Sequence, residues 1–446
     1  WAYRQDQLPS THPIAADMYD LEAVELNFDG ITYAKGASAL RQLVAFVGKD
    51  DFLAGVRSYF AEHAWGNTQL DDLLHHLQVA SGRDLSFFTT QWLQTAGVNT
   101  LAADWDADAD GVFSRFGIRQ WAHADWPTLR RHRVAVGFYN VVDGVLTRTQ
   151  RFEFDIDGEY TDVPEVVGQT RPDLMLLNDD DLTYAKIRLD ARSLSTLVDN
   201  IHVLDDELAR ALAWGATWDL TRDGEMAAAD YVELVLRGVG VETDLTAVNA
   251  LLLQARTAID YYAPRADRRA LADRFTGGLA RLLKEAEPGS DHQLSIARAL
   301  ALSINDADGA AVLRAWLDGT EAPEGLAIDT DLRWRLLTEL ARVGAAGEAE
   351  IAAEAERDRT ATGAEKAAGA RAASKDAAAK AEAWAAATER DTPNETHFQI
   401  CSQFWQLDQD EVLAPYADRY LDVVDAIGSG SGPWATASTT IRQHVL

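Results

Sequence analysis

The spacing of hydrophobic residues changes twice along this chain of 446 residues, and that change limits the possible folds more than any other feature. In residues 1–98 apolar side chains recur about every 3.6 positions, the period of a helix face. In residues 99–190 the period falls to two, as in a β-strand, and in residues 191–446 it is helical again. Because the chain is also longer than one hydrophobic core usually organises, we predict three domains with these boundaries.

The first region contains helices whose ends and buried faces can be predicted. In "NTQLDDLLHHLQVASG", Thr68 followed by Asp71 predicts an N-cap with an acidic third helical residue, and Gly82 predicts the helix end. The segment "GASALRQLVAFVG" predicts a helix whose buried face consists of Leu40, Leu43, Val44 and Val47.

The second region carries two hairpin signals. Apolar residues alternate on both sides of Asp143-Gly144 in "RHRVAVGFYNVVDGVLTRTQRFEFDIDG". An Asp-Gly pair between alternating runs favours a type I′ turn, because both central residues of that turn need positive φ. The segment "DADGVF", residues 108–113, predicts a second hairpin of the same kind. We therefore predict a small antiparallel β-sandwich.

The third region is a succession of short helical segments. Strand patterns are missing from it, and its helical segments are separated by Pro264, Pro288-Gly289, Pro323 and Pro393-Asn394. Short helix pairs repeated over such a length predict an α-solenoid.

The formal net charge of −30 restricts the partners of the chain. It opposes binding to phosphate backbones and anionic lipid, so we expect neither nucleic acid nor membrane as a partner. No apolar run is long enough to cross a bilayer. Cys401 is the only cysteine, so no internal disulfide can form, which favours a reducing, cytoplasmic location.

Two patterns that could suggest a metal site fail on geometry. Residues 106–111, "DADADG", match the opening of a calcium loop, but Gly117 stands where that loop needs a bidentate glutamate. His75 and His76 are neighbours, and on a helix they point about 100° apart, so the pair cannot converge on one ion. The zinc-protease signature H-E-x-x-H is absent from the sequence, so we predict no metal ligand in this chain.

Tyr33 is the one candidate catalytic residue. It lies where a turn gives way to a helix in "FDGITYAKGASALRQLVAFVG". The pattern alone allows two interpretations: a core tyrosine whose hydroxyl finds a partner, or a catalytic hydroxyl. Tyr33 precedes Leu40 by seven positions and would share its helix face, which favours the core residue.

Four segments carry a resemblance that bears on this choice. They are "HPI" (12–14), "FDGITYAKGA" (28–37), "FLAGVRSYFAEHAWGNT" (52–68) and "WLQTAGVNTL" (92–101). Their order and spacing resemble the zinc aminopeptidase N family, the gluzincin exopeptidases. The resemblance is to the C-terminal portion of a bacterial member, beginning after the zinc-binding helices.

The resemblance implies a fold and a role for Tyr33. Residues 1–98 would end a thermolysin-like catalytic domain, residues 99–190 would form its β-sandwich, and residues 191–446 an α-solenoid of HEAT-like helix pairs. The family's matching tyrosine donates its hydroxyl to the oxyanion of the tetrahedral intermediate opposite the zinc, a role that falls on Tyr33. The resemblance thus favours the catalytic interpretation.

The resemblance also implies what this chain lacks. The family's zinc ligands, its general-base glutamate and its G-x-M-E-N loop precede the matching segment, so we expect the missing N-terminal and zinc-binding domains as partners and no zinc bound here. Lys35 and Gly36 complete the tyrosine motif: we predict a structural role for Lys35 and close helix packing at Gly36. His12 belongs to a loop motif and is predicted to be structural.

The sequence therefore predicts part of a zinc-dependent aminopeptidase that releases N-terminal amino acids from peptides, with a helical domain that caps the active site. The chain alone should be inactive, because it would supply one hydroxyl and no metal. A non-enzymatic α-solenoid scaffold for protein partners is the alternative from another class. A complete enzyme with a different metal site, built from scattered histidines, is a third.

Overall fold

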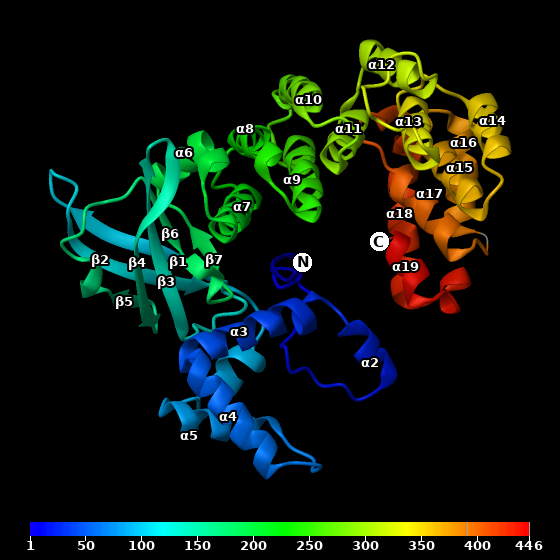
Figure 1. Cartoon of the computed structure of the whole chain (residues 1–446). Helices are drawn as coiled ribbons and strands as arrows, with labels where there is room; N and C mark the ends of the chain where they lie inside the picture. Colours follow the sequence, from blue (N-terminus) through cyan, green and yellow to red (C-terminus); the bar gives the residue numbers. More distant parts are fainter. Residues whose placement is uncertain (390, 446) are drawn as a thin grey trace. The chain divides into compact units, whose positions relative to one another are not determined.

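The computed structural model describes residues 1–389 and 391–445. The chain divides into two compact units, Trp1–Arg237 and Gly238–Leu446. Figure 1 shows the helices and strands of the chain with their labels. Most of the described residues are helical, and two small sheets lie in the first unit. No described helix combines the length and the apolar character needed to cross a membrane. Compact units need not coincide with domains, so the three predicted domain boundaries stay predictions.

The first unit opens with helices that pack around one hydrophobic core. The α-helices are α1 (Ala2–Gln5), α2 (Leu21–Leu26), α3 (Gly36–Val47), α4 (Lys49–Glu62) and α5 (Leu70–Ser81). Two π-helices, η1 (Ile31–Lys35) and η2 (Thr89–Leu93), lie among them. Figure 1 shows α4 and α5 side by side. The core that these elements share includes Leu43, Phe46, Leu77, Phe88 and Trp92.

The buried face of α3 differs in part from the predicted one. Leu43 and Val47 are buried as predicted, whereas Val44 is half-buried. Leu40 is 52% exposed, so its predicted burial is wrong. The buried face of α3 consists of Ala39, Gln42, Leu43, Phe46 and Val47, which recur at steps of three and four. Leu40 directly follows Ala39 and therefore points about 100° away from this face.

Helix α5 begins one residue later than predicted. Its N-cap is Gln69, whose backbone N–H donates to the Asp72 carboxylate at 2.8 Å. The hydroxyl of Thr68, the predicted cap, instead shares a hydrogen bond with the Tyr59 hydroxyl at 2.5 Å. Gly82 ends the helix as predicted, in the left-handed conformation with φ of 66°.

Residues 99–188 form a four-stranded and a three-stranded sheet. The strands are β1 (Asn99–Ala107), β2 (Phe113–Ala122), β3 (His132–Val142), β4 (Val145–Ile156), β5 (Tyr160–Asp162), β6 (Leu174–Leu177) and β7 (Lys186–Arg188). Their order is β5-β2-β1-β7 in one sheet and β4-β3-β6 in the other. Apolar side chains from both sheets form one buried cluster that includes Leu101, Phe116, Val136, Phe138 and Ile187.

Both predicted hairpins are present, but the second does not have the predicted turn, because Asp110 is not among the residues with positive φ. Strands β3 and β4 are antiparallel and joined through Asp143 and Gly144, whose φ values of 52° and 82° are both positive, as the turn requires. Strands β1 and β2 are joined through a turn in which Gly111 has φ of 78°. The predicted antiparallel pairing holds for the other strand pairs but not for β7, which runs parallel to β1. The chain reaches β7 only after completing the other sheet.

Three helices end the first unit and many more form the second. Helices α6 (Ala191–Asn200), α7 (Glu207–Arg222) and α8 (Ala228–Gly238) follow the sheets. The second unit contains α9 (Leu245–Thr257), α10 (Arg268–Glu285), α11 (Asp291–Ser303), α12 (Ala307–Leu317), α13 (Thr330–Arg342), α14 (Glu348–Arg357), α15 (Ala361–Ala373), α16 (Ala377–Thr388), α17 (Asn394–Phe404), α18 (Asp410–Ser429) and α19 (Thr439–Val445).

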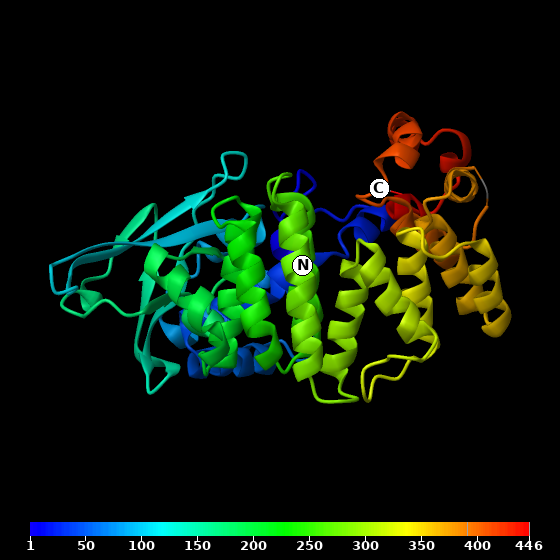
Figure 2. The ribbon, with the colours of Figure 1, turned by 90° about the horizontal axis from the view of Figure 1, so that it is seen from above.

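Successive helices of the second unit pack against one another. Helices α10 and α11, α12 and α13, and α16 and α17 are neighbours, and Figure 2 shows such helices running up and down beside each other. The predicted prolines lie between helices or at their first turn, and the described residues of this unit contain no strand, as predicted. The second unit is therefore helical throughout its described length.

Candidate functional site

Tyr33 lies on a π-helix, η1, that leads directly into α3. The start of η1 is held by Asp29, whose Oδ1 accepts hydrogen bonds from the backbone N–H groups of Ile31 at 2.8 Å and Thr32 at 3.1 Å. π-Helical turns are rare and are found frequently at functional sites, because they displace one residue from the ordinary helical register. The candidate catalytic residue Tyr33 thus lies in a rare, π-helical backbone conformation.

The side chain of Tyr33 is not part of the core of this chain. It is 52% exposed, and its ring meets Phe28 edge to face with 5.6 Å between centroids. Among the described residues no side chain forms a hydrogen bond with its hydroxyl. The interpretation of Tyr33 as a core tyrosine with a satisfied hydroxyl is therefore wrong for this chain. A hydroxyl in this position can donate to a ligand.

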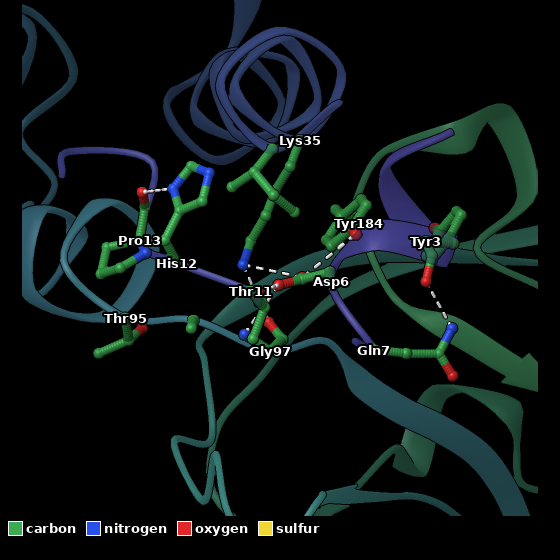
Figure 3. Close-up of polar contacts among 12 residues, drawn as sticks. Tyr3, Asp6, Gln7, Thr11, His12, Pro13, Lys35, Thr95, Gly97 and Tyr184 are labelled. Carbon is green, nitrogen blue, oxygen red and sulfur yellow. Dashed lines mark hydrogen bonds and ion pairs between the residues drawn. The ribbon is translucent and has the colours of Figure 1, made fainter. Parts of the chain in front are cut away.

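His12 fixes the carboxylate that caps η1. Its Nε2 lies 3.0 Å from Asp29 Oδ2 and its Nδ1 lies 2.8 Å from the Pro13 carbonyl oxygen. Figure 3 shows the ring beside the Pro13 carbonyl. These two contacts hold the His12 ring between the Pro13 carbonyl and the carboxylate at the start of η1. This agrees with the structural role predicted for His12.

Lys35, at the end of η1, is buried in an ion pair with Asp6. Its Nζ lies 2.9 Å from Asp6 Oδ2 and donates to the Gly97 carbonyl oxygen at 3.0 Å, and neither side chain of the pair is exposed (Figure 3). Asp6 also accepts hydrogen bonds from Gly97 N–H at 2.9 Å, Thr11 Oγ1 at 2.7 Å and the Tyr184 hydroxyl at 3.2 Å. The pair thus joins four separate segments of the first unit around the base of η1.

Burial and charge act in opposite directions on Lys35. Burial disfavours the ammonium form and lowers the pKa of Lys35 to about 8, although the neighbouring Asp6 carboxylate favours that form. The Lys35 side chain points into this network, whereas the Tyr33 side chain is exposed. Lys35 therefore has a structural place, in agreement with its predicted role.

The predicted reason for Gly36 is not supported by the packing. A Cβ built on Gly36 would lie 3.6 Å from Ile14 Cγ2, an ordinary van der Waals distance, so close helix packing does not require glycine there. Sequence reasoning also missed Asp6, which is twenty-nine positions away from Lys35 and has no local signal. Asp29 could have been found, because an aspartate just before a helix is a typical capping residue.

One group of side chains has the spacing of a metal site among the residues that the structure describes. Glu62, His63 and His76 place their possible ligand atoms within 4.8 Å of one another. His75 is exposed, His76 is buried, and their rings meet edge to face with centroids 5.8 Å apart. His75 is not part of the group. The partner of His76 is His63, from the preceding helix end, which the sequence pattern did not reveal. This group lies on α4 and α5, whereas Tyr33 lies on η1.

Two protein families match the chain. The ERAP1-like C-terminal domain matches residues 174–444 and the Peptidase family M1 domain matches residues 2–92. The chain belongs to the family of the ERAP1-like C-terminal domain, preceded by a segment of an M1 peptidase domain. The predicted resemblance to the zinc aminopeptidase N family is thereby confirmed.

Three individual relatives illustrate the similarity, and two of them are named as aminopeptidases. Over 453 residues, which cover all of this chain and 52% of the relative, the chain is 50% identical to Aminopeptidase N of Streptomyces lividans. It is 38% identical over 96 residues to Leucyl aminopeptidase of Saccharolobus solfataricus, which covers 22% of this chain and 12% of that protein. The match to Tricorn protease-interacting factor F2 of Thermoplasma volcanium is 37% identical over 107 residues, or 24% of this chain and 14% of that protein. The chain thus spans about half the length of the Streptomyces protein, and the other two matches cover less.

Proposed function

We propose that this chain is the C-terminal part of a zinc aminopeptidase that releases N-terminal amino acids from peptides, and that Tyr33 supplies its transition-state hydroxyl. The identity shared with Aminopeptidase N of Streptomyces lividans along the whole chain supports the activity. The single observation that carries the role of Tyr33 is its exposed hydroxyl on a π-helix capped by Asp29. That arrangement places a neutral donor on the surface and fixes the backbone beneath it.

The physical role of Tyr33 is to stabilise charge that appears only during the reaction. When water adds to a peptide carbonyl, its oxygen becomes an oxyanion, and a hydrogen-bond donor placed there binds the transition state more tightly than the substrate. Such a donor typically accelerates the reaction by about two orders of magnitude or more. A tyrosine hydroxyl is a hydrogen-bond donor and so can serve in this role.

The surroundings of Tyr33 do not fit a zinc ion. The one group of possible ligands among the described residues is Glu62, His63 and His76, and it lies on α4 and α5 rather than on η1. In our proposal the catalytic zinc, which would activate the attacking water, is held by a part of the enzyme outside this chain. Tyr33 itself acts as hydrogen-bond donor and contributes no metal ligand.

The rest of the chain would support this site. We assign residues 1–98 to the end of a thermolysin-like catalytic domain, residues 99–190 to a β-sandwich and residues 191–446 to a HEAT-like α-solenoid that limits access to the active site. The common core of the two sheets supports the sandwich, and the packing of successive helices supports the solenoid. The single cysteine supports a cytoplasmic location.

The proposal is tested in the full-length enzyme with an alanyl reporter amide. Full-length protein should hydrolyse the reporter, and the 446-residue chain alone should not. Tyr33→Phe should lose activity while Tyr160→Phe, which also removes one tyrosine hydroxyl, should keep it. The Tyr160 hydroxyl lies on β5 and accepts a hydrogen bond from Arg115, so its loss controls for general effects of the substitution.

The scaffold alternative explains less of the chain. A protein-binding α-solenoid would account for the helices after residue 191, but not for the match of residues 2–92 to an M1 peptidase domain. It would also not explain why Tyr33 lies exposed on a π-helix that is capped by Asp29. If the full-length protein is inactive on every aminoacyl reporter, the scaffold becomes the better account.

A further inference from the structure

The C-terminal end of α4 and the middle of α5 bring three metal-ligating side chains together. Glu62 is the last residue of α4, His63 is its C-cap, and His76 lies in the second turn of α5. Their possible ligand atoms all lie within 4.8 Å of one another. The two helices pack directly against each other, so the group joins both of them.

His76 is already oriented as a metal ligand would be. Its side chain is 8% exposed, and its Nδ1 lies 2.9 Å from Ser58 Oγ. With Nδ1–H donating to Ser58, Nε2 carries the free lone pair, and this nitrogen lies 3.6 Å from Glu62 Oε2. A hydrogen bond to the second ring nitrogen is the usual way in which proteins fix the tautomer and orientation of a ligating histidine.

The contacts within the group do not account for this arrangement by themselves. The distance of 3.6 Å between His76 and Glu62 is too long for a good hydrogen bond, and the Glu62 side chain is 68% exposed. An ion pair with so exposed a partner contributes little to stability. The rings of His63 and His76 meet edge to face with centroids 5.5 Å apart, so the two imidazoles are direct neighbours.

The donor set selects the class of ion. Two imidazoles and one carboxylate suit Zn²⁺ and other late first-row divalent ions, whereas Ca²⁺ and Mg²⁺ prefer oxygen ligands. A tetrahedral ion with bonds of about 2.0–2.1 Å needs ligand atoms roughly 3.3 Å apart. Glu62 and His63 lie at a helix end and are not buried, so their side chains can close the remaining distance onto His76.

We propose that Glu62, His63 and His76 form a zinc site that clamps the end of α4 to α5, with water completing the coordination. The site does not depend on the proposed peptidase function, because none of its residues is assigned a part in hydrolysis. It revises the expectation that this chain binds no zinc. Ser58 acts as the positioning residue for His76.

The test is a Zn²⁺ titration of the 446-residue chain, freed of metal with a chelator and followed by calorimetry. The wild type should bind one Zn²⁺ per chain, and His63→Gln, His76→Gln and Glu62→Gln should each weaken binding at least tenfold. His75→Gln is the matched control, because it removes the exposed neighbouring histidine, and its affinity should stay within twofold of wild type. Ser58→Ala should weaken binding about tenfold.

Two further readouts separate a built site from loss of folding. Co²⁺ bound at this group should give the absorption spectrum of a tetrahedral N/O site, and that spectrum should be lost in His76→Gln. Circular dichroism in chelator should show the same helix content for all variants, and Glu62→Gln changes only an exposed side chain. Wild-type chain that binds no Zn²⁺, or equal affinity in His75→Gln and His76→Gln, would overturn the proposal.

Discussion

At the scale of single residues, the first unit depends on charge buried around Lys35. The Asp6 carboxylate and the Lys35 ammonium are both inaccessible to water, and backbone groups and hydroxyls surround the carboxylate. Removing one member of such a pair leaves the other charge uncompensated, which is far more costly than removing an exposed pair. Stability should therefore respond strongly to Asp6 and weakly to a surface aspartate.

Asp6→Asn should destabilise the first unit by about 3–5 kcal/mol, because the buried Lys35 would lose its counterion and must either stay charged without a partner or give up its proton. Urea denaturation of the 446-residue chain, followed by tryptophan fluorescence, measures the change. Asp125→Asn makes the same chemical replacement at a carboxylate that is 76% exposed and should change stability by less than about 1 kcal/mol. Equal effects of the two substitutions would contradict the importance of the buried pair.

The depressed pKa of Lys35 also predicts a pH dependence. Burial lowers this pKa from 10.5 to about 8, so between these values the unfolded chain binds a proton that the folded chain has released. Stability contributed by this group must therefore rise as the pH increases from 8 to 10.5, by up to about 3 kcal/mol. Burial raises the pKa of Tyr184 well above its usual value of 10, so near pH 10 the unfolded chain loses that proton first and Tyr184 acts in the opposite direction to Lys35.

The comparison that isolates Lys35 is the free energy of unfolding of wild type and Lys35→Met at pH 7.5 and pH 9.5. The wild type should gain stability relative to the variant on going to the higher pH. If the difference in free energy of unfolding between wild type and Lys35→Met is the same at both pH values, Lys35 does not titrate in this window.

At the scale of elements, η1 is the feature that positions the candidate catalytic residue. Asp29 caps its first two N–H groups, and His12 holds the other oxygen of the same carboxylate. Loss of a capping side chain typically costs about 1 kcal/mol of local stability. The first effect of that loss should be on the placement of Tyr33 rather than on the fold.

Asp29→Ala in the full-length enzyme should therefore lower kcat about tenfold or more, with a smaller change in KM, because a displaced donor no longer matches the oxyanion. Steady-state kinetics on a reporter amide measures both constants. In a Tyr33→Phe background the same substitution should have little further effect, since the hydroxyl that it positions is already gone. If the fold-decreases in kcat of the two single variants multiply in the double variant, Asp29 acts independently of Tyr33.

The elements that could be predicted are those with a local signal. Asp143-Gly144 determines its hairpin because the turn chemistry is contained in two residues. The π-helix of Tyr33 has no such signal, and neither does the parallel pairing of β7 with β1, which joins segments far apart in sequence. The approach of His76 to His63 depends on how two helices pack, so each histidine alone gave no indication of it.

At the scale of the whole molecule, the net charge of −30 is the property most open to experiment. A strongly acidic protein attracts cationic ligands over distances comparable to the Debye length, which is about 10 Å at 0.1 M salt. Peptide substrates carry a positive α-amino group. Under the proposed function, the acidic chain raises the local concentration of peptides near the active site of the complete enzyme.

The value of kcat/KM for a cationic peptide should consequently fall severalfold between 20 mM and 500 mM NaCl, with most of the change in KM. A peptide of equal length with added glutamates should show a smaller or opposite effect. Stopped or continuous peptide assays on the full-length enzyme give both values. If kcat/KM for both peptides does not change with ionic strength, electrostatic attraction does not contribute to substrate binding.

The most direct test of the central claim is kcat of the full-length enzyme with Tyr33→Phe, measured at saturating reporter amide and saturating zinc. The account predicts a fall of about a hundredfold or more, with unchanged circular dichroism and KM nearly preserved, because the hydroxyl is used only in the transition state. Wild-type kcat in the variant would contradict the account and leave Tyr33 as an ordinary exposed aromatic residue.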